Sequence, residues 1–325
     1  MRRLFNFAFA ALAAGLAYPA HAETTLKVGD QQLQTRGILE AAGQLKDLPY
    51  RIEWFNFPAA QPLGEALNAG AIDVGGLGDA PLIFAYAAGA RVRAVAATRS
   101  TPIDLAIIVP EASLIRSAAD LKGKRIATTR GSIGHHLAIA TLERAGIKLS
   151  EVSLRFMQPA DAKAALASGN VDAWSTWDPY VALAEQRDHD RSIANGVNLS
   201  SGLSFQAATE SSIKAKQAEI ADFLKRVAAG QRWALSHPDE VAAMQSKVTG
   251  LPPDVLRTVY QRAQLHPVPI DDGLIAEQQK TANLYERADV IKTYLDVAPS
   301  FDRRFPLAAP RCARARLPFS SASHE

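Results

Sequence analysis

The chain has 325 residues, with 36 Lys and Arg against 33 Asp and Glu and a single cysteine, Cys312. The excess of positive charge comes from arginines in residues 1–22 and 303–325; without these segments 29 basic and 32 acidic residues remain. The body of the chain, residues 23–302, is therefore nearly neutral. This argues against a nucleic-acid-binding surface, which requires a basic patch. One thiol excludes an intramolecular disulfide and a cysteine-rich metal site.

The N-terminus has the pattern of a secretory signal peptide. Arg2 and Arg3 precede an almost wholly apolar run over residues 4–17, and Ala20-His21-Ala22 fits the small-x-small rule for cleavage. The run is shorter than the roughly 20 apolar residues that span a bilayer. A buried first helix is the alternative, but it would not explain the basic start. We therefore predict that residues 1–22 are removed during export to the periplasm.

Short runs rich in β-branched residues alternate with helical segments over the first two thirds of the body. The predicted strands are residues 26–28, 51–55, 72–74, 92–96, 105–109, 125–127, 152–156 and 171–175. The predicted helices are residues 35–46, 61–69, 81–88, 134–145, 160–168 and 179–186. This alternation predicts α/β units, each with a mainly parallel sheet between helices.

The pattern becomes helical throughout from residue 211 to residue 287. Ile220, Phe223, Leu224 and Val227 recur at helical spacing, and prolines separate the successive helices. We expect this block to pack around the first lobe. Two successive α/β units and a return strand over 205–209 predict two lobes. The predicted boundaries are residues 23–104 plus 205–302 for lobe 1, residues 105–204 for lobe 2, and residues 303–325 for a disordered tail.

Motifs that carry catalysis are missing from the sequence. It contains no G-x-S-x-G, H-E-x-x-H, C-x-x-C or P-loop pattern. The run from Gly75 to Gly78 lacks the G-x-G-x-x-G spacing of a dinucleotide site. His135 and His136 are adjacent, so on a helix they point about 100° apart and cannot chelate one metal. Neither a cofactor nor a metal is expected, and binding is favoured over chemistry.

Polar residues stand where predicted strands give way to helices. Ser132 and His135 open the helix after 125–127, Asp79 precedes Pro81 at the start of another, and Thr101 follows the strand 92–96. A helix N-terminus offers free N–H groups and the positive end of a dipole, so it can bind an anion without a charged side chain. Each residue also has a plainer interpretation, as an ordinary cap or a turn residue.

Two tryptophans lie at the junction of a predicted strand and a helix. Alternation along the strand sends Trp174 and Thr176 to one face and Ser175 and Trp177 to the other. One indole can thus pack in the core while the other lines a cleft, where it would supply an apolar wall and an N–H donor. Two core tryptophans are the alternative.

Several short motifs together resemble the aliphatic sulfonate-binding proteins of ABC importers, in the wider nitrate, sulfonate and taurine receptor group. The resemblance extends from Leu26 to Asp296 and implies a type II periplasmic binding protein fold: two α/β lobes, a ligand cleft between them and a C-terminal helical block. The segments that carry it are Leu67–Asp73, Gly78–Pro81 with Ala85–Gly89, Ala119–Lys124, Gly131-Ser132 with His135, Pro159–Ala162, Val171–Trp174 and Trp177–Tyr180.

The resemblance implies a monomeric periplasmic receptor that captures an aliphatic sulfonate and delivers it to permease subunits in the inner membrane, without chemistry of its own. Receptors for taurine, nitrate or an aromatic sulfonate remain alternatives, as does an enzyme of pyrimidine-precursor biosynthesis on the same scaffold. The positions that match the family's anion site are Gln31, Ala60, Gln61, Asp79, Ala80, Thr101, Ser132 and His135, with Trp177 and Asp178 flanking the pocket from the second lobe.

The chain departs from the family pattern at two places in this site. The loop after Phe57 reads Pro-Ala-Ala-Gln-Pro where the family has a Gly-Pro pair, and Asp79 replaces a longer glutamate. Alanine restricts the backbone where glycine would not. We expect these changes to affect the choice of ligand more than the fold. A zwitterion such as taurine would need a carboxylate near its amine, so an inward-facing Asp79 or Asp178 would favour it.

Overall fold

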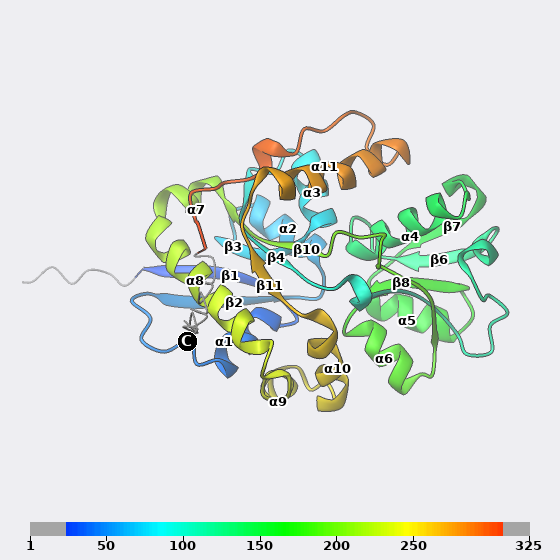
Figure 1. The fold of residues 1–325 in the computed structure, drawn as a ribbon, viewed down its shortest axis with the longest axis horizontal. Coiled ribbons are helices and arrows are strands. Elements are labelled where there is room, and N and C mark those ends of the chain that lie inside the picture. Colours follow the sequence, from blue (N-terminus) through cyan, green and yellow to red (C-terminus); the bar gives the residue numbers. More distant parts are fainter. Residues whose placement is uncertain (1–23, 308–325) are drawn as a thin grey trace, which may run out of the picture.

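The computed structural model describes residues 24–307. The predicted signal segment lies outside the described residues, as does most of the predicted tail. Two sheets lie side by side, each in its own lobe, and the chain crosses between them after β4 and again before β10 (Figure 1). This arrangement is the predicted two-lobed α/β fold.

Lobe 1 contains a six-stranded mixed sheet. Its order is β11-β4-β10-β3-β1-β2, in which β1 is parallel to β2 and β3, and β10 is antiparallel to β3 and β4. Its strands are β1 (Thr25–Gln31), β2 (Arg51–Phe57), β3 (Val74–Gly78), β4 (Val92–Arg99), β10 (Leu203–Thr209) and β11 (His266–Val268). Its early helices are α1 (Gln34–Ala41), α2 (Ala60–Asn68) and α3 (Asp79–Ala87).

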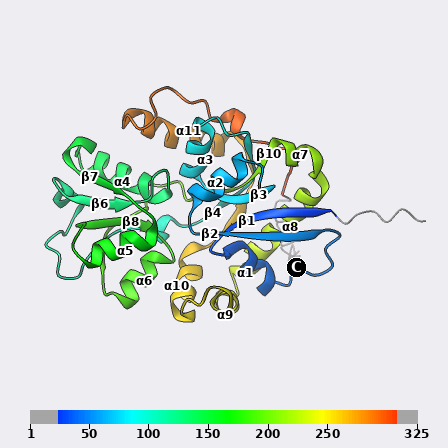
Figure 2. The same ribbon diagram turned by 180° about the vertical axis from the view of Figure 1, so that it is seen from behind.

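Lobe 2 contains a five-stranded sheet in the order β7-β6-β8-β5-β9, covered by three helices (Figure 2). Its strands are β5 (Leu105–Val109), β6 (Arg125–Thr128), β7 (Ser153–Phe156), β8 (Ala173–Trp177) and β9 (Arg191–Asn195). Its helices are α4 (Ile133–Arg144), α5 (Pro159–Ala167) and α6 (Tyr180–Arg187). The edge strand β9 was not predicted; it pairs antiparallel to β5 and has few hydrophobic residues to mark it.

The C-terminal block is helical, as predicted, but it packs against both lobes. It comprises α7 (Glu210–Ala215), α8 (Gln217–Ala234), α9 (Pro238–Thr249), α10 (Pro253–Ala263) and α11 (Asp272–Arg287). Val255 and Val259 of α10 pack on Ala182 of α6, and Gln186 of α6 donates to the Thr258 hydroxyl at 2.8 Å. Since α6 belongs to lobe 2, α10 bridges the lobes beside the crossovers (Figure 1).

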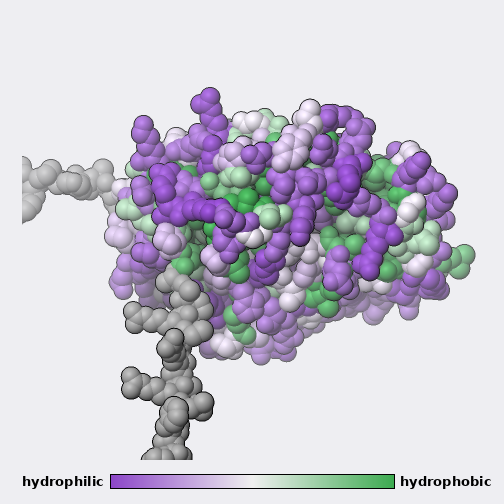
Figure 3. Space-filling model, turned by 45° about the horizontal axis from the view of Figure 1, so that its top comes forward, coloured by the Kyte–Doolittle hydropathy of each residue, from purple (hydrophilic) through white to green (hydrophobic). Residues whose placement is uncertain are grey.

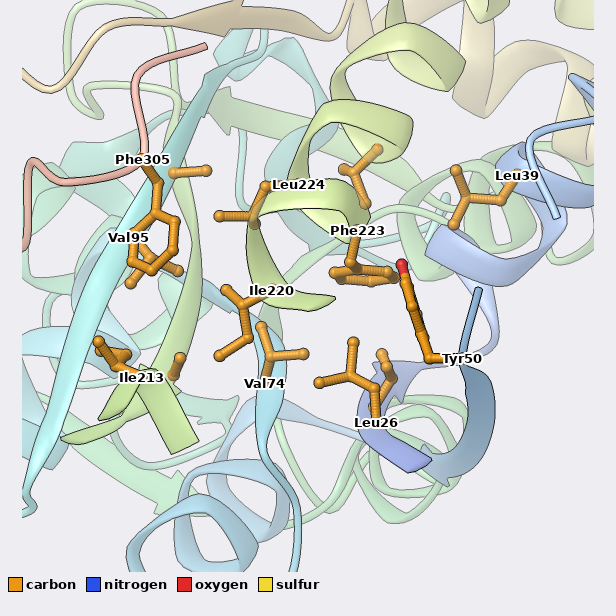
Figure 4. Packing of buried hydrophobic residues seen from close by; sticks show 14 residues of the cluster. Leu26, Leu39, Tyr50, Val74, Val95, Ile213, Ile220, Phe223, Leu224 and Phe305 are labelled. Atoms are coloured by element: carbon orange, nitrogen blue, oxygen red, sulfur yellow. The ribbon is translucent and has the colours of Figure 1, made fainter. Parts of the chain in front are cut away.

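The predicted apolar stripe of α8 forms the centre of the lobe 1 core. Ile220, Phe223 and Leu224 pack against β-strand residues, and burying each such side chain contributes about 1.5–3 kcal/mol (Figure 4). Phe305 joins the same cluster beside Val95 and is 8% exposed. Residues 303–307, assigned above to a disordered tail, are therefore part of the fold.

One face of the described residues is mostly polar (Figure 3). On the face in Figure 3, apolar residues are scattered among hydrophilic ones. None of the helices in residues 24–307 combines the length and the apolar character needed to cross a membrane.

The strand directions place several helix starts at one edge of each sheet. In lobe 1 the parallel strands β1, β2 and β3 end next to one another and lead into α1, α2 and α3. In lobe 2 β6 and β8 are parallel and lead into α4 and α6. Ligands of such sheets bind beyond the carboxyl ends of the strands, which is where the two lobes meet here.

Candidate ligand-binding site

A cavity of about 200 Å³ lies between the lobes, beyond the carboxyl ends of the parallel strands. Residues of both lobes line it, and the C-terminal block supplies a further wall through α10. The lining residues that the sequence predicted are Gln31, Ala60, Asp79, Ser132, Trp177 and Asp178.

Three of the predicted site residues lie outside this lining and do not face the cavity. Gln61 is exposed, and its amide donates to the Glu65 carboxylate one turn further along α2, at 3.1 Å. Thr101 is also exposed, and its hydroxyl donates to the carbonyl of Arg262. Ala80 is fully buried behind the first residue of α3.

His135 is a fourth predicted residue outside the lining, because it points into the core. It is 2% exposed, its Nδ1 accepts the Gly131 N–H at 3.3 Å, and its ring packs against Phe84 and Phe156 at 5.9 and 5.0 Å between centroids. Burial, followed by the positive charge of Arg130, lowers the pKa of His135 to about 4. The imidazole is therefore neutral at neutral pH and acts as a buried packing group.

The N-terminus of α2 reaches the cavity without a side-chain cap. Its N-cap residue, Ala59, is extended, and no side chain accepts the first N–H groups of the helix. Ala60 follows at the first helical position, is 7% exposed and lines the cavity. A helix start with unsatisfied N–H groups in a cavity can bind an anion.

Ser132 caps α4 with its own side chain. Its Oγ accepts the His135 N–H at 3.1 Å and donates to the Thr129 carbonyl at 2.7 Å. The hydroxyl hydrogen is thus already used within the protein. The interpretation of Ser132 as an ordinary cap holds for its side chain, although the residue lies in the cavity wall beside Ile133.

Asp79 faces the cavity wall with a carboxylate that the protein already satisfies. Oδ1 accepts the N–H of Ala80 at 2.7 Å, and Oδ2 accepts the Ser201 hydroxyl at 2.7 Å. The carbonyl of Asp79 accepts the Gln278 amide of α11 at 2.8 Å. These contacts hold the start of α3 to the strand β10 region and to the C-terminal block.

Asp30 and Asp104 line the cavity as well, and the sequence predictions omitted both. Asp30 is buried, with 2% of its surface exposed. Its carboxylate accepts the N–H groups of Thr35 and Arg36 at 3.1 and 2.8 Å, so it caps the start of α1. Burial raises the pKa of Asp30 to about 6. Burial and then the negative charge of Asp178 raise the pKa of Asp104 to about 7.

Asp178 and Trp177 also belong to the lobe 2 side of the cavity. Trp177 is half-buried and lines it, whereas Trp174 is 2% exposed in the core; strand alternation predicted opposite faces for the two indoles without saying which would face the cavity. Asp178 Oδ1 accepts the Ala182 N–H at 2.9 Å, and Arg262 Nη1 lies 3.8 Å away. Burial raises the pKa of Asp178 to about 6 although Arg262 opposes the shift.

The remaining lining residues come mainly from segments that no sequence motif marked. They are Gln32, Gln34, Thr35 and Ile38 around the start of α1, Gly76–Gly78, Pro81, Ser100, Leu105, Ser200, Gly202–Ser204, and Val259, Tyr260, Ala263 and Leu265 from α10 and the turn after it. The sequence placed α10 only as one of several helices separated by prolines, and it did not show that this helix would line the cavity.

The NMT1/THI5-like family matches residues 58–241 of the chain. A relative from Escherichia coli (strain K12), provisionally named an aliphatic sulfonates-binding protein, is 33% identical over 304 residues, or 91% of this chain and 95% of the relative.

Solved structures of similar proteins cover most of the chain. The alkanesulfonate-binding protein SsuA from Xanthomonas axonopodis pv. citri, bound to MOPS, is 31% identical with a TM-score of 0.80, over 87% of this chain and 99% of that one. The periplasmic aliphatic sulphonate binding protein SsuA from Escherichia coli is 31% identical with a TM-score of 0.78, over 93% of this chain and 99% of that one. The desulfurization enzyme DSZB shares the fold alone: it is 18% identical with a TM-score of 0.60, over 87% of this chain and 97% of that one.

Proposed function

The chain belongs to the NMT1/THI5-like family, and we propose that it is the periplasmic substrate-binding component of an ABC importer for aliphatic sulfonates. The proposal takes its ligand class from the alkanesulfonate-binding relatives. The observation in this chain that carries it is the uncapped start of α2 in a cavity between two lobes. A sulfonate stays ionised at physiological pH and needs only donors, which backbone N–H groups supply.

The walls of the cavity suggest how binding is coupled to closure. Ala60 belongs to lobe 1 and Trp177 to lobe 2, so a ligand between them contacts both lobes. Next to the cavity, the Gln32 amide of lobe 1 donates to the Tyr180 hydroxyl of lobe 2 at 2.5 Å. A ligand that contacts both lobes binds the closed arrangement better and shifts the population toward it. The closed receptor would then be the form that the permease subunits recognise.

The signal-peptide pattern at the N-terminus supports the part of this proposal that concerns export. Residues 1–22 would direct the chain to the periplasm and be removed there, leaving Glu23 as the first residue. N-terminal sequencing of the protein from a periplasmic fraction tests this. A mature chain that still begins at Met1 would contradict it.

The residues that line the cavity fit a binding protein better than an enzyme. The described residues that line the cavity include no cysteine, histidine or lysine. Three of its four aspartates, Asp30, Asp79 and Asp178, accept hydrogen bonds from backbone N–H groups, which leaves few groups free to act as a nucleophile or general base. Because the fold also occurs in a desulfurization enzyme, the purified protein should be assayed for products from organic sulfonates. Any turnover would overturn the receptor assignment.

A thermal-shift panel of alkanesulfonates, taurine, nitrate and sulfate tests the ligand class. A ligand at about a hundred times its Kd stabilises the folded protein by about 2.7 kcal/mol. We expect a short alkanesulfonate to raise the melting temperature and sulfate and nitrate to have little effect. A response to nitrate alone would refute the sulfonate assignment.

The Ala60→Pro variant tests whether the start of α2 binds the ligand. Proline is favoured at the first helical position, and the extended Ala59 (φ −157°, ψ 171°) suits a residue before proline, so the helix should form. The substitution removes one free N–H from the cavity and should weaken sulfonate binding. Asp272→Pro, at the first position of α11, is the matched control and should bind as the wild type does.

A further inference from the structure

The cavity to which we assign an anion is surrounded by acidic side chains. Among the described lining residues are four aspartates, Asp30, Asp79, Asp104 and Asp178, and none of these lining residues is Lys, Arg or His. In a cavity of about 200 Å³ an anion lies within a Debye length, about 8–10 Å, of every carboxylate in the wall. Like charges repel in a partly desolvated site, so these carboxylates oppose the binding of an anion while they are ionised.

Asp104 is the carboxylate best placed to respond to an anion. It is half-buried and lies in the cavity wall. Among the described residues, the hydrogen bond that favours its ionised form comes from its own backbone N–H. The other three aspartates accept hydrogen bonds from the N–H groups of other residues. Asp104 therefore has the weakest support for its negative charge.

The charged groups around Asp104 come from several elements. Asp178, whose N–H donates to the Asp104 backbone carbonyl at 2.9 Å, is acidic, as is Asp79 at the start of α3. Arg262 of α10 is positive, but its Nη2 contacts Glu185 at 2.6 Å and its Nη1 lies 3.8 Å from Asp178 Oδ1. Burial and then the charge of Asp178 raise the pKa of Asp104 to about 7. This carboxyl group therefore exchanges its proton near neutral pH.

Other ionisable side chains nearby keep their charge state between pH 6 and pH 9. Tyr260 lines the cavity, and burial raises its pKa, so it stays protonated and neutral. His135 points into the core and has a pKa of about 4, so it stays neutral. Arg191 of β9, the strand beside Asp104, donates to the carbonyls of residues 111, 113 and 115. A proton that the cavity takes up in this range therefore goes to an aspartate.

We propose that the receptor takes up a proton on the pair Asp104 and Asp178 when a sulfonate enters the cavity, so that its affinity rises as the pH falls. This rests on the proposed function, in which the sulfonate binds at the start of α2. The proton comes from the solvent and neutralises one carboxylate, so ligand and proton together add no net charge to the cavity. The sulfonate itself stays ionised throughout this range, so the pH dependence arises in the protein.

The direction and the range of the effect follow from linkage. An anion in the cavity favours the protonated form of Asp104 and so raises its pKa above the value of about 7 in the free protein. Between these two pKa values the complex holds more protons than the free receptor, so binding weakens as the pH rises from about 7. Each pKa unit of this shift corresponds to about a tenfold change in affinity.

Calorimetric titration of propane-1-sulfonate tests both the affinity and the proton. The affinity should be about tenfold higher at pH 6 than at pH 9. Near pH 7.5, titrations in phosphate and in imidazole buffer should give different heats, because the buffer releases the proton that the site takes up and the two buffers differ in their enthalpy of ionisation. Buffers that are themselves sulfonates must be avoided, because they would compete for the site.

Three variants locate the proton. Asp104→Asn removes the charge, so it should bind at pH 9 about as tightly as the wild type does at pH 6. Asp178→Asn keeps an oxygen for the Ala182 N–H and should also reduce the pH dependence, and it serves if Asp104→Asn does not fold. Asp190→Asn is the matched control: burial raises the pKa of Asp190 to about 6, but this residue is not part of the lining, so the pH dependence should persist.

The outcomes separate this proposal from the one on which it rests. If the affinity is the same at pH 6 and pH 9 and the heat is the same in both buffers, the proton uptake is wrong and the sulfonate receptor stands. The same holds if Asp104→Asn and Asp178→Asn both keep the full pH dependence, or if Asp190→Asn loses it. If neither propane-1-sulfonate nor any other alkanesulfonate binds at any pH, both proposals are wrong.

Discussion

Replacing His135 by Gln should change how the stability of the protein depends on pH. The imidazole is 2% exposed and stacked against Phe84, and burial lowers its pKa from 6.5 to about 4. In the unfolded chain it takes up a proton as the pH falls below 6.5, but in the folded protein it stays neutral until about pH 4. The unfolded state therefore binds more protons in this window, and folding stability falls as the pH decreases.

The size of the effect follows from the two pKa values of His135. Between pH 7 and pH 5 the folded protein loses about 2 kcal/mol through this one group. His135→Gln removes that loss. Its amide can still accept the Gly131 N–H, although it loses the aromatic packing. The variant should be less stable than the wild type at pH 7, and the gap should shrink by about 2 kcal/mol at pH 5.

Urea unfolding followed by tryptophan fluorescence at the two pH values measures the difference. Burial raises the pKa values of Asp30, Asp104 and Asp178, so their contribution has the opposite sign, but it is common to both proteins and cancels in the comparison. His266→Gln, at an exposed histidine, controls for the loss of an imidazole. If the free energy of unfolding changes equally between pH 7 and pH 5 in the wild type and in His135→Gln, the imidazole of His135 is not buried in its neutral form. A lost sulfonate response in a folded variant would instead support a role in the site.

Gly134→Ala should destabilise the protein by about 2 kcal/mol in urea unfolding, because the new Cβ would lie 2.6 Å from the backbone oxygen of Ser175. Gly64→Ala lies in the middle of α2, and a Cβ added there would have no heavy atom within 4 Å, so this variant should stabilise the protein by about 0.5–1 kcal/mol. A decrease in stability would contradict the open space around this Cβ. Asp73→Ala should cost about 3 kcal/mol, because the carboxylate accepts hydrogen bonds from β1, α7 and Lys216, and a cost near zero would contradict this network. Trp177→Phe should remove most of the ligand-induced change in tryptophan emission, and an unchanged response would place the ligand elsewhere.

The elements of the fold were largely predictable because they rest on local chemistry. The helix predicted over 134–145 is found as α4 over Ile133–Arg144, and the strand over 105–109 is β5 with the same bounds. α1 ends at Ala41, five residues before the predicted end, since residues 42–46 turn away after it. β9 escaped prediction because an edge strand with a weak apolar pattern depends on its partner for its conformation.

The candidate site was only partly predictable. Ala60, Ser132 and Trp177 line the cavity because strand ends and helix starts lie together in any such sheet. The direction of a side chain within a helix turn was not predictable: His135 points into the core, while Ser132, three residues earlier, lies in the cavity wall. Asp104 belongs to no motif and lines the cavity only because the crossover brings it to Asp178.

By itself the sequence determined the two α/β units, the helical C-terminal block and the positions of the helix starts, because hydrophobic period, glycines and prolines act over a few residues. The tertiary structure decided which side chains line the cavity and which of its carboxylates accept hydrogen bonds from the rest of the protein. That outcome depends on partners far along the chain, such as Ser201, whose hydroxyl donates to the Asp79 carboxylate, and Asp178, whose N–H donates to the Asp104 backbone carbonyl. No local sequence pattern encodes these meetings.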